Sequence, residues 1–193
     1  MKPKPLLSRV KSENLPDDIR AAWDNSMLLR GDGTFFEVFA KHPELYRWYI
    51  EEFYGKVFRL GKVKNRYKQL LRLKLSTLHG CKFCNQGNRK DALESGLSQE
   101  QIENFEDPNL DLFTKADLAV MDLAECLSMS NPNGIVDPSL YSRLQENFCD
   151  AEIIELGFVG SILTGIAKFL FAFDVTRARS GQPGGQRALR QRR

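Results

Sequence analysis

Histidine and β-branched residues are scarce in this chain of 193 residues. A four-ligand zinc site usually contains a second close cysteine pair, but this chain has one such pair, two isolated cysteines and two histidines, so we expect no metal. Valine, isoleucine and threonine together occur 21 times, against 25 leucines. Because β-branched residues prefer strands and leucine loses little rotamer freedom in a helix, this balance predicts an all-α fold.

Long hydrophobic runs are also missing. The first sixteen residues contain no apolar stretch of the kind found in secretory signals, so we expect a cytoplasmic protein. The most apolar stretch, Leu156 to Ala167, has twelve residues, whereas a membrane-spanning helix needs about 20. We therefore expect it to be a buried helix, with no membrane contact. In a reducing cytoplasm, a close cysteine pair is more often catalytic, redox-active or metal-binding than structural.

Most of the chain has no excess of positive charge. The net charge is +3, but residues 176–193 contain six arginines and no acid, so the remainder is mildly acidic. A nucleic-acid-binding domain would carry its basic residues on a folded face, so we expect no nucleic-acid partner. The length and composition predict an N-terminal extension at 1–14, one domain at 15–175 and a basic, disordered tail at 176–193.

Helix start and stop signals divide the domain into about eight helices. Thr34, Thr114, Asp137 and Asp150 are candidate N-caps, and Gly96 suits a C-terminal cap. The last helix, expected from Ala151 to about Val175, has small residues at three- and four-residue spacings, which would let another helix approach closely. These small residues are Gly157, Gly160, Ser161, Thr164 and Gly165.

The sequence Cys81-Lys82-Phe83-Cys84 stands at an expected helix start. Two cysteines three residues apart on a helix suit the roughly 5.5–6 Å Cα separation of a disulfide, and the helix N-terminus favours the reactive thiolate. The spacing alone also suits two inert small hydrophobic residues or part of a zinc site. A thioredoxin-like motif would need a preceding strand, but the residues before Cys81 are helical in pattern. We expect Cys126 and Cys149 to be core residues.

Residues 66–105 resemble the alkylhydroperoxidase D-like (AhpD-like) and carboxymuconolactone decarboxylase superfamily. Its members carry a glutamate, eleven residues, C-x-x-C, and a histidine four residues later. His42-Pro43-Glu44-Leu45 and residues 150–175 extend the likeness to about 15–175. The resemblance implies an all-α homo-oligomer that reduces hydroperoxides, with Cys84 peroxidatic, Cys81 resolving and an external dithiol as reductant. We expect no cofactor.

The sequence departs from the family pattern at both proton-relay positions. Gln69 stands at the glutamate position and Asn88 at the histidine position, and neither amide can take a thiol proton. General acid–base help is worth roughly 10²–10⁴-fold in rate. His79, two residues before Cys81, is the base near the cysteines in sequence that could act at neutral pH. It could equally be a loop residue without a chemical role. Gln69 and Cys81 would be about 18 Å apart on one continuous helix, so they share a site only if the chain folds back at His79-Gly80.

Three functions follow as hypotheses. The first is a thiol-dependent peroxidase, possible only at a reduced rate if nothing replaces the relay. The second is a non-catalytic helical oligomer that binds a partner or a small ligand in the former pocket. The third is lactone decarboxylation, whose branch of the family typically lacks the cysteine pair.

Overall fold

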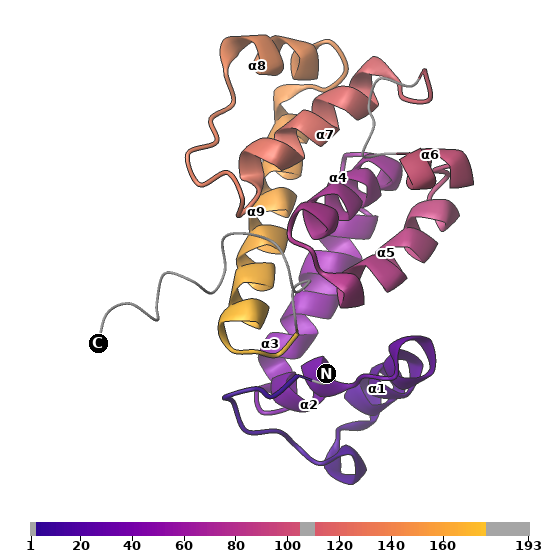
Figure 1. Cartoon of the computed structure of the whole chain (residues 1–193), viewed down its shortest axis with the longest axis vertical. Helices are drawn as coiled ribbons and strands as arrows, with labels where there is room; N and C mark the ends of the chain where they lie inside the picture. Colours follow the sequence, from indigo (N-terminus) through magenta and orange to yellow (C-terminus); the bar gives the residue numbers. More distant parts are fainter. Residues whose placement is uncertain (1–2, 105–110, 177–193) are drawn as a thin grey trace.

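The regular structure of the chain is helical throughout the part described by the computed structural model, residues 3–104 and 111–176 without the side chain of Lys82 (Figure 1). The all-α prediction is confirmed. The helices are α1 (Asp17–Arg30), α2 (Thr34–Phe39), α3 (Pro43–Arg47), α4 (Asn65–Leu78), α5 (Lys82–Glu94), α6 (Gln99–Asn104), α7 (Lys115–Leu127), α8 (Pro138–Gln145) and α9 (Asp150–Ala172), with a 3₁₀ turn η1 (Ser12–Asn14) and a π-helix η2 (Trp48–Arg59). Of the predicted basic tail, residues 177–193 lie outside the described residues.

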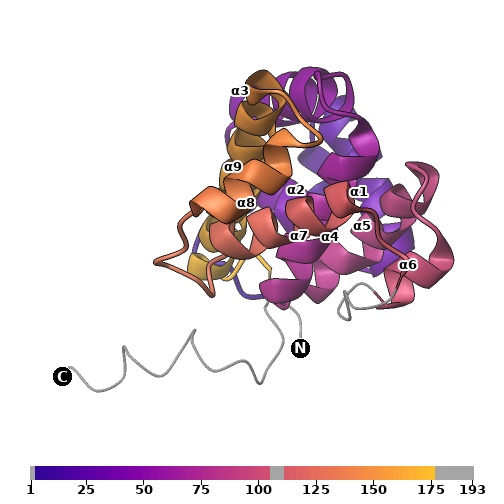
Figure 2. The same cartoon turned by 90° about the horizontal axis from the view of Figure 1, so that it is seen from above.

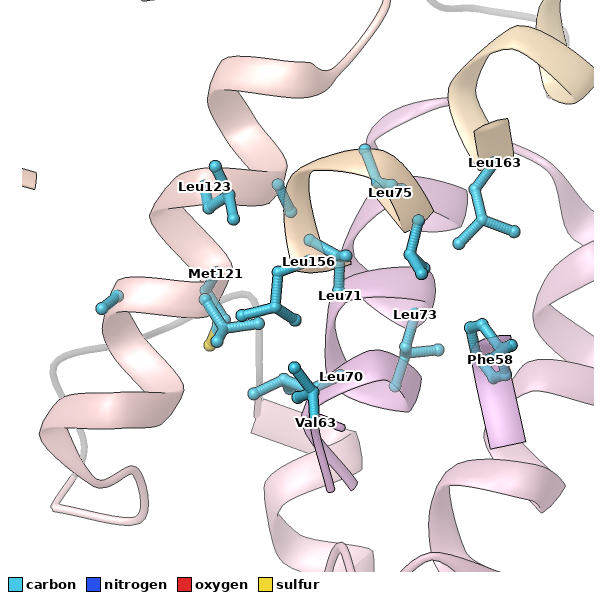
Figure 3. Close-up of a cluster of buried hydrophobic side chains, with 14 of the residues drawn as sticks. Phe58, Val63, Leu70, Leu71, Leu73, Leu75, Met121, Leu123, Leu156 and Leu163 are labelled. Atoms are coloured by element: carbon cyan, nitrogen blue, oxygen red, sulfur yellow. The ribbon is translucent and has the colours of Figure 1, made fainter. Parts of the chain in front are cut away.

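Helix α4 occupies the centre of the molecule and contacts α5, α7 and α9 (Figures 1 and 2). Its leucines are buried on more than one face, as expected of a helix surrounded by others. Figure 3 shows these leucines converging with side chains of α7 and α9. The labelled members of this cluster are Phe58, Val63, Leu70, Leu71, Leu73, Leu75, Met121, Leu123, Leu156 and Leu163.

A buried ion pair ties α4 to α9. The Nζ of Lys68, which is completely buried, donates to Glu155 Oε1 at 2.7 Å and to the carbonyl of Val57 at 2.8 Å. Glu155 also accepts the backbone N–H groups of Lys62 at 2.7 Å and Val63 at 3.2 Å. Burial acts to raise the pKa of Glu155, but these hydrogen bonds outweigh it and hold the pKa below its usual value. The pair therefore joins two helices and the turn before α4 with its polar groups satisfied.

The segment predicted as one helix from Pro43 is α3 followed by the π-helix η2. In a π-helix, residues five apart come together. Tyr49 and Tyr54 have ring centroids 5.1 Å apart, and those of Phe53 and Phe58 are 6.2 Å apart. Apolar residues at four- and five-residue spacings suit either kind of helix, so the sequence pattern does not distinguish them.

Helix α9 differs from the expected buried helix. It has 23 residues, its most apolar 18-residue stretch has a mean hydropathy of 1.7, and in the described part of the chain it is the one helix long and apolar enough to cross a membrane. One face packs in the core, where a Cβ added at Gly160 would overlap Leu127 of α7. The other face is open, with Ile154 71% and Phe158 56% exposed. The long helix predicted from Ala151 is present, but the prediction that its apolar stretch is buried is wrong for one face, because neighbouring helices cover the other face alone.

Two of the four predicted N-caps and the predicted burial of one free cysteine differ from the structure. Thr114 and Asp137 are N-caps as predicted, whereas Gly33 replaces Thr34 and Cys149 replaces Asp150 in that role. Cys149 is exposed because it begins α9 at the surface, so its assignment to the core is wrong. Cys126, near the end of α7, is only partly buried.

The described part of the predicted N-terminal extension packs against the domain. The backbone N–H of Leu6 donates to the carbonyl of Phe173 at 3.1 Å, and that of Val10 donates to the carbonyl of Glu37 at 2.9 Å. Leu7 and Val10 also join a second apolar cluster, built mainly from α1, α2, α3 and the end of α9. The beginning of the chain therefore holds the two ends of the domain together.

Replacing Lys68 with methionine should lower the free energy of unfolding by about 3–5 kcal/mol, because it leaves a buried carboxylate without its cation. Urea denaturation measures this change. The matched control is Lys56→Met, which breaks the exposed pair with Glu52 and should have a much smaller effect. Equal losses in the two variants would contradict the structural importance of the Lys68–Glu155 pair.

Candidate functional site

The site begins at a sharp reversal of the chain. Helix α4 ends at Leu78, and Gly80 has φ of +65°, a backbone conformation that residues other than glycine rarely adopt. Helix α5 then starts at Lys82 and packs along α4. The fold-back required for residues of α4 to lie beside α5 is therefore present.

Cys81 and Cys84 form a disulfide at the start of α5, with their Cα atoms 5.3 Å apart. Cys81 is the N-cap residue, and its Sγ accepts the backbone N–H of Cys84 at 3.2 Å. Cys81 is 1% exposed, while Cys84 is partly exposed. The predicted ability of this spacing to form a disulfide is confirmed, and of the two cysteines Cys84 is the more accessible from solvent.

A chain of hydrogen bonds lies one turn along α5 from Cys84. The amide nitrogen of Asn88 donates to Ser76 Oγ at 2.9 Å, and Ser76 Oγ donates to Asn85 Oδ1. None of these three side chains titrates near neutral pH. Asn88 is thus held in a fixed orientation by Ser76 of α4 without a group that could carry its proton further. Ser76 was missed by the sequence analysis, although a serine in a leucine-rich helix is a signal of a buried polar contact.

Gln69 lies farther along the interface between α4 and α5. Its Oε1 accepts a hydrogen bond from Arg72, whose guanidinium also donates to Asp91 Oδ2 at 2.6 Å. Because Gln69 is seven residues before Ser76, the two are separated by about 10 Å along α4. Its partners are therefore at the Asp91 end of α5 instead of at the cysteines. A polar pocket of about 180 Å³ adjoins Gln69 there. Its lining residues are Arg59, Asn65, Gln69, Asp91, Glu94 and Ser95.

His79 is buried at the end of α4. Its Nε2 accepts the backbone N–H of Met129 at 3.1 Å, and burial lowers its pKa to about 4. It is therefore neutral and weakly basic at pH 7. This geometry supports a role in anchoring the segment after α7, and a catalytic role for His79 stays a prediction.

Arg30, at the end of α1, was also missed. Its Nε donates to the carbonyl of Phe83 at 3.2 Å, and its guanidinium lies over the Phe83 ring, 4.7 Å from the centroid. Arg30 is separated from Phe83 by 53 positions, and no local pattern reveals such a contact. Gly87 in the middle of α5 was the available signal, because glycine inside a helix often marks a close approach by another group.

The described residues contain no cluster of three or more histidine, cysteine, aspartate or glutamate side chains that could hold a metal ion. The polar groups near the cysteines are hydroxyls, amides and guanidinium groups. The disulfide-forming pair itself is the feature suited to thiol chemistry.

Residues 43–112, which include the cysteine pair, match the model of the carboxymuconolactone decarboxylase family. This segment is thus similar to the members of that family. The uncharacterised protein YdfG of Bacillus subtilis is 22% identical over 102 residues, which cover 52% of this chain and 69% of that protein. The family resemblance predicted from the sequence is confirmed.

Solved structures show the same fold. The apo debrominase Bmp8 has a TM-score of 0.71 at 16% identity, over 92% of this chain and 94% of that one. An AhpD-core, peroxidase-related protein of Ralstonia eutropha JMP134 has a TM-score of 0.60 at 14% identity, over 93% and 95% of the two chains. An AhpD-type protein of unknown function from Agrobacterium tumefaciens has a TM-score of 0.61 at 18% identity, over 70% and 91%. The predicted AhpD-like fold is thus confirmed.

The burial of neutral His79 predicts a loss of stability in acid. Its folded pKa of about 4 is below the ordinary value of 6.5, so the unfolded chain binds more protons between these pH values. The free energy of unfolding should therefore fall as pH decreases from about 6.5 to about 4, by at most about 1.4 kcal/mol per pH unit from this group. In His79→Gln, whose amide oxygen can still accept the Met129 N–H, this component should disappear.

Urea denaturation at several pH values measures the difference between the two proteins. The control is His42→Asn, which changes the other histidine, an exposed N-cap residue, and should keep the wild-type pH dependence. Parallel curves for wild type and His79→Gln would show that His79 is not the group responsible.

Proposed function

We propose that this protein reduces organic hydroperoxides through Cys84 and Cys81. The observation that carries the proposal is the disulfide-forming pair at the N-terminus of α5, with Cys84 accessible and Cys81 buried behind it. A helix N-terminus favours thiolate formation, and the accessible cysteine is the one that a peroxide can reach. The family segment around the pair supports the same chemistry.

The proposed reaction has two steps and a reset. The Cys84 thiolate attacks the distal oxygen of the hydroperoxide, the O–O bond breaks, and the leaving alkoxide takes a proton from water to become an alcohol. Cys84 is thereby oxidised to a sulfenic acid. The Cys81 thiolate then attacks Cys84 Sγ, forming the disulfide and releasing the oxygen as water after protonation. An external dithiol reduces the disulfide by exchange and is itself oxidised.

The surroundings of the pair suit a peroxidase without a titrating relay. Asn88, Ser76 and Asn85 can orient groups by hydrogen bonding but cannot exchange protons near neutral pH. Protons must then come from solvent, and the rate should follow the fraction of Cys84 present as thiolate. The loss of general acid–base help predicts a rate lower by roughly 10²–10⁴-fold than that of a site with such a relay.

In Cys84→Ser, peroxide consumption with excess dithiol should fall to the level without protein. In Cys81→Ser, turnover should slow, because the external dithiol must then attack the Cys84 sulfenic acid directly in place of Cys81. Coupled consumption of a dithiol reductant measures both rates. Cys149→Ser, which removes an exposed free thiol, is the control and should retain the wild-type rate. Equal consumption by wild type and Cys84→Ser would contradict the proposal.

The same amide cluster favours a second candidate, a non-catalytic protein that binds a partner or small ligand. Under this alternative, the pKa of Cys84 in the reduced protein should be the ordinary value of about 8.5, and alkylation at pH 6 should be slow. Fast alkylation of Cys84 at pH 6 would contradict it. No feature of the described residues supports lactone decarboxylation in particular.

We also propose that a second copy of the chain covers the open face of α9. This helix is the most apolar of the long helices, yet only 22% of its most apolar 18-residue stretch is buried. Open space surrounds the positions where Gly157 and Gly165 would carry a Cβ, so a second helix can approach closely. An exposed apolar face of this kind is typical of an interaction surface.

Phe158→Glu should shift the protein towards monomer, because it places a charge in the proposed interface. Light scattering after size-exclusion chromatography measures the mass. Leu28→Glu changes a side chain of α1 that is 90% exposed and should leave the mass unchanged. A wild-type protein that is monomeric at micromolar concentration would contradict the proposed assembly.

A further inference from the structure

The guanidinium of Arg30 lies against the first two turns of α5, beside the cysteine pair. It is anchored on one side by the carbonyl and ring of Phe83, which precedes Cys84. A Cβ added at Gly87 would overlap its Nη2, so the guanidinium occupies the space left by the missing side chain. Arg30 therefore bridges from the residue next to Cys84 to a residue one turn beyond it.

Gly87 shares a helix face with the reactive cysteine. Residues 84, 87 and 91 are three and four positions apart, so they follow one another along the same side of α5, with about 5–6 Å between neighbouring Cβ positions. A guanidinium over Gly87 thus lies between Cys84 on one side and Asp91 on the other. The attraction of Asp91 and the repulsion of Arg72 both reach Arg30.

The positive charge of Arg30 has no carboxylate of its own within the described part of the chain. Its hydrogen bonds go to neutral acceptors, the carbonyl of Phe83 and the hydroxyl of Ser26. Asp91, the acid on this face, instead accepts a hydrogen bond from Arg72 of α4 in a close ion pair. Burial lowers the pKa of Arg30 below its ordinary value; Asp91 opposes this shift and Arg72 adds to it. A partly buried cation without a matching anion is costly, and a nearby thiolate would offset that cost.

The other charges around this part of α5 do not supply the same effect. The acids of α6, Glu100 and Glu103, are exposed, and Arg89 of α5 points its Nη1 towards the carbonyl of Ile102 in α6. His79 is buried and neutral at pH 7. Among the described residues, Arg30 of α1 is therefore the cation that lies on the face of α5 shared by Cys84 and Gly87.

We propose that Arg30 is a positioning residue that supplies the charge favouring the Cys84 thiolate, and that Gly87 provides the gap that admits it. This inference rests on the proposed thiol chemistry and replaces a titrating relay with a fixed charge. The thiol proton leaves to solvent, while Arg30 stays protonated throughout, because a guanidinium does not deprotonate in proteins. The sequence positions of the family relay give no indication of this arrangement.

Alkylation rates of the reduced full-length protein across pH 5 to 9 test the inference. Lys82 separates the cysteines, so trypsin places Cys81 in residues 75–82 and Cys84 in residues 83–89, and mass spectrometry follows each thiol separately. Arg30→Gln should raise the pKa of the Cys84 thiol by about one pH unit or more, with Arg30→Lys in between. Arg89→Gln removes an arginine charge from α5 itself, where its guanidinium contacts Ile102 of α6, and should have little effect.

Gly87→Ala provides the decisive variant, because it displaces the guanidinium without removing any charge. Alanine favours the helix over glycine, and the overlapping atom is the end of a flexible side chain, so the protein should remain folded, as circular dichroism would check. Its Cys84 pKa should rise as in Arg30→Gln, and the double variant should show no further rise. Unchanged Cys84 pKa values in Arg30→Gln and Gly87→Ala would overturn the inference.

The Cys84 pKa measurements test the effect of Arg30 separately from the proposed peroxidase activity. A wild-type protein that consumes peroxide, with an Arg30-independent Cys84 pKa, would overturn the inference alone. A wild-type protein that consumes no peroxide would overturn the proposed function, whereas an Arg30-dependent Cys84 pKa would still support the charge effect.

Discussion

The reversal at Gly80 determines how the rest of the site is built. The positive φ of Gly80 lets the chain leave α4 and return as α5, so that the two helices pack along each other. The cysteine pair then begins α5, where the backbone N–H of Cys84 in the first turn donates to Cys81 Sγ. A straight helix through this point would separate the polar residues of α4 from the cysteines and leave no site. The buried leucines on the other sides of α4 hold this reversal in place.

The interface between α4 and α5 changes character along its length. Beside the cysteines it contains the uncharged Ser76, Asn85 and Asn88, whereas farther along it contains the Arg72–Asp91 ion pair. The uncharged groups beside the cysteines join α5 to α4 by hydrogen bonds but do not titrate near neutral pH. In our proposal, the charge that favours the thiolate comes instead from a third helix, through Arg30 of α1. The functional hypothesis follows from this division: a dithiol held at a helix start and influenced by fixed charge.

Local patterns predicted much of this structure. The leucine-rich composition predicted the helical fold, and the caps at Thr114 and Asp137 and the break at His79-Gly80 placed several boundaries correctly. These features depend on neighbours in sequence. The contacts of Arg30 and Lys68 depend on helices far apart in the chain, and those of Ser76 depend on how two successive helices pack, which no local spacing encodes. The exposure of Cys149 and of one face of α9 was mispredicted for a related reason, since an apolar pattern does not reveal which faces other helices cover.

The most direct test of the account is the mass of the Cys81–Cys84 region after reduced protein meets one equivalent of an organic hydroperoxide. The segment should lose the mass of two hydrogen atoms, because the two cysteines form the disulfide seen in the structure, and one equivalent of alcohol should form. The same protein with Cys81→Ser should instead retain one added oxygen on Cys84. Reduced, unmodified cysteines alongside unconsumed peroxide would contradict the central claim that Cys84 and Cys81 form a peroxide-reducing pair.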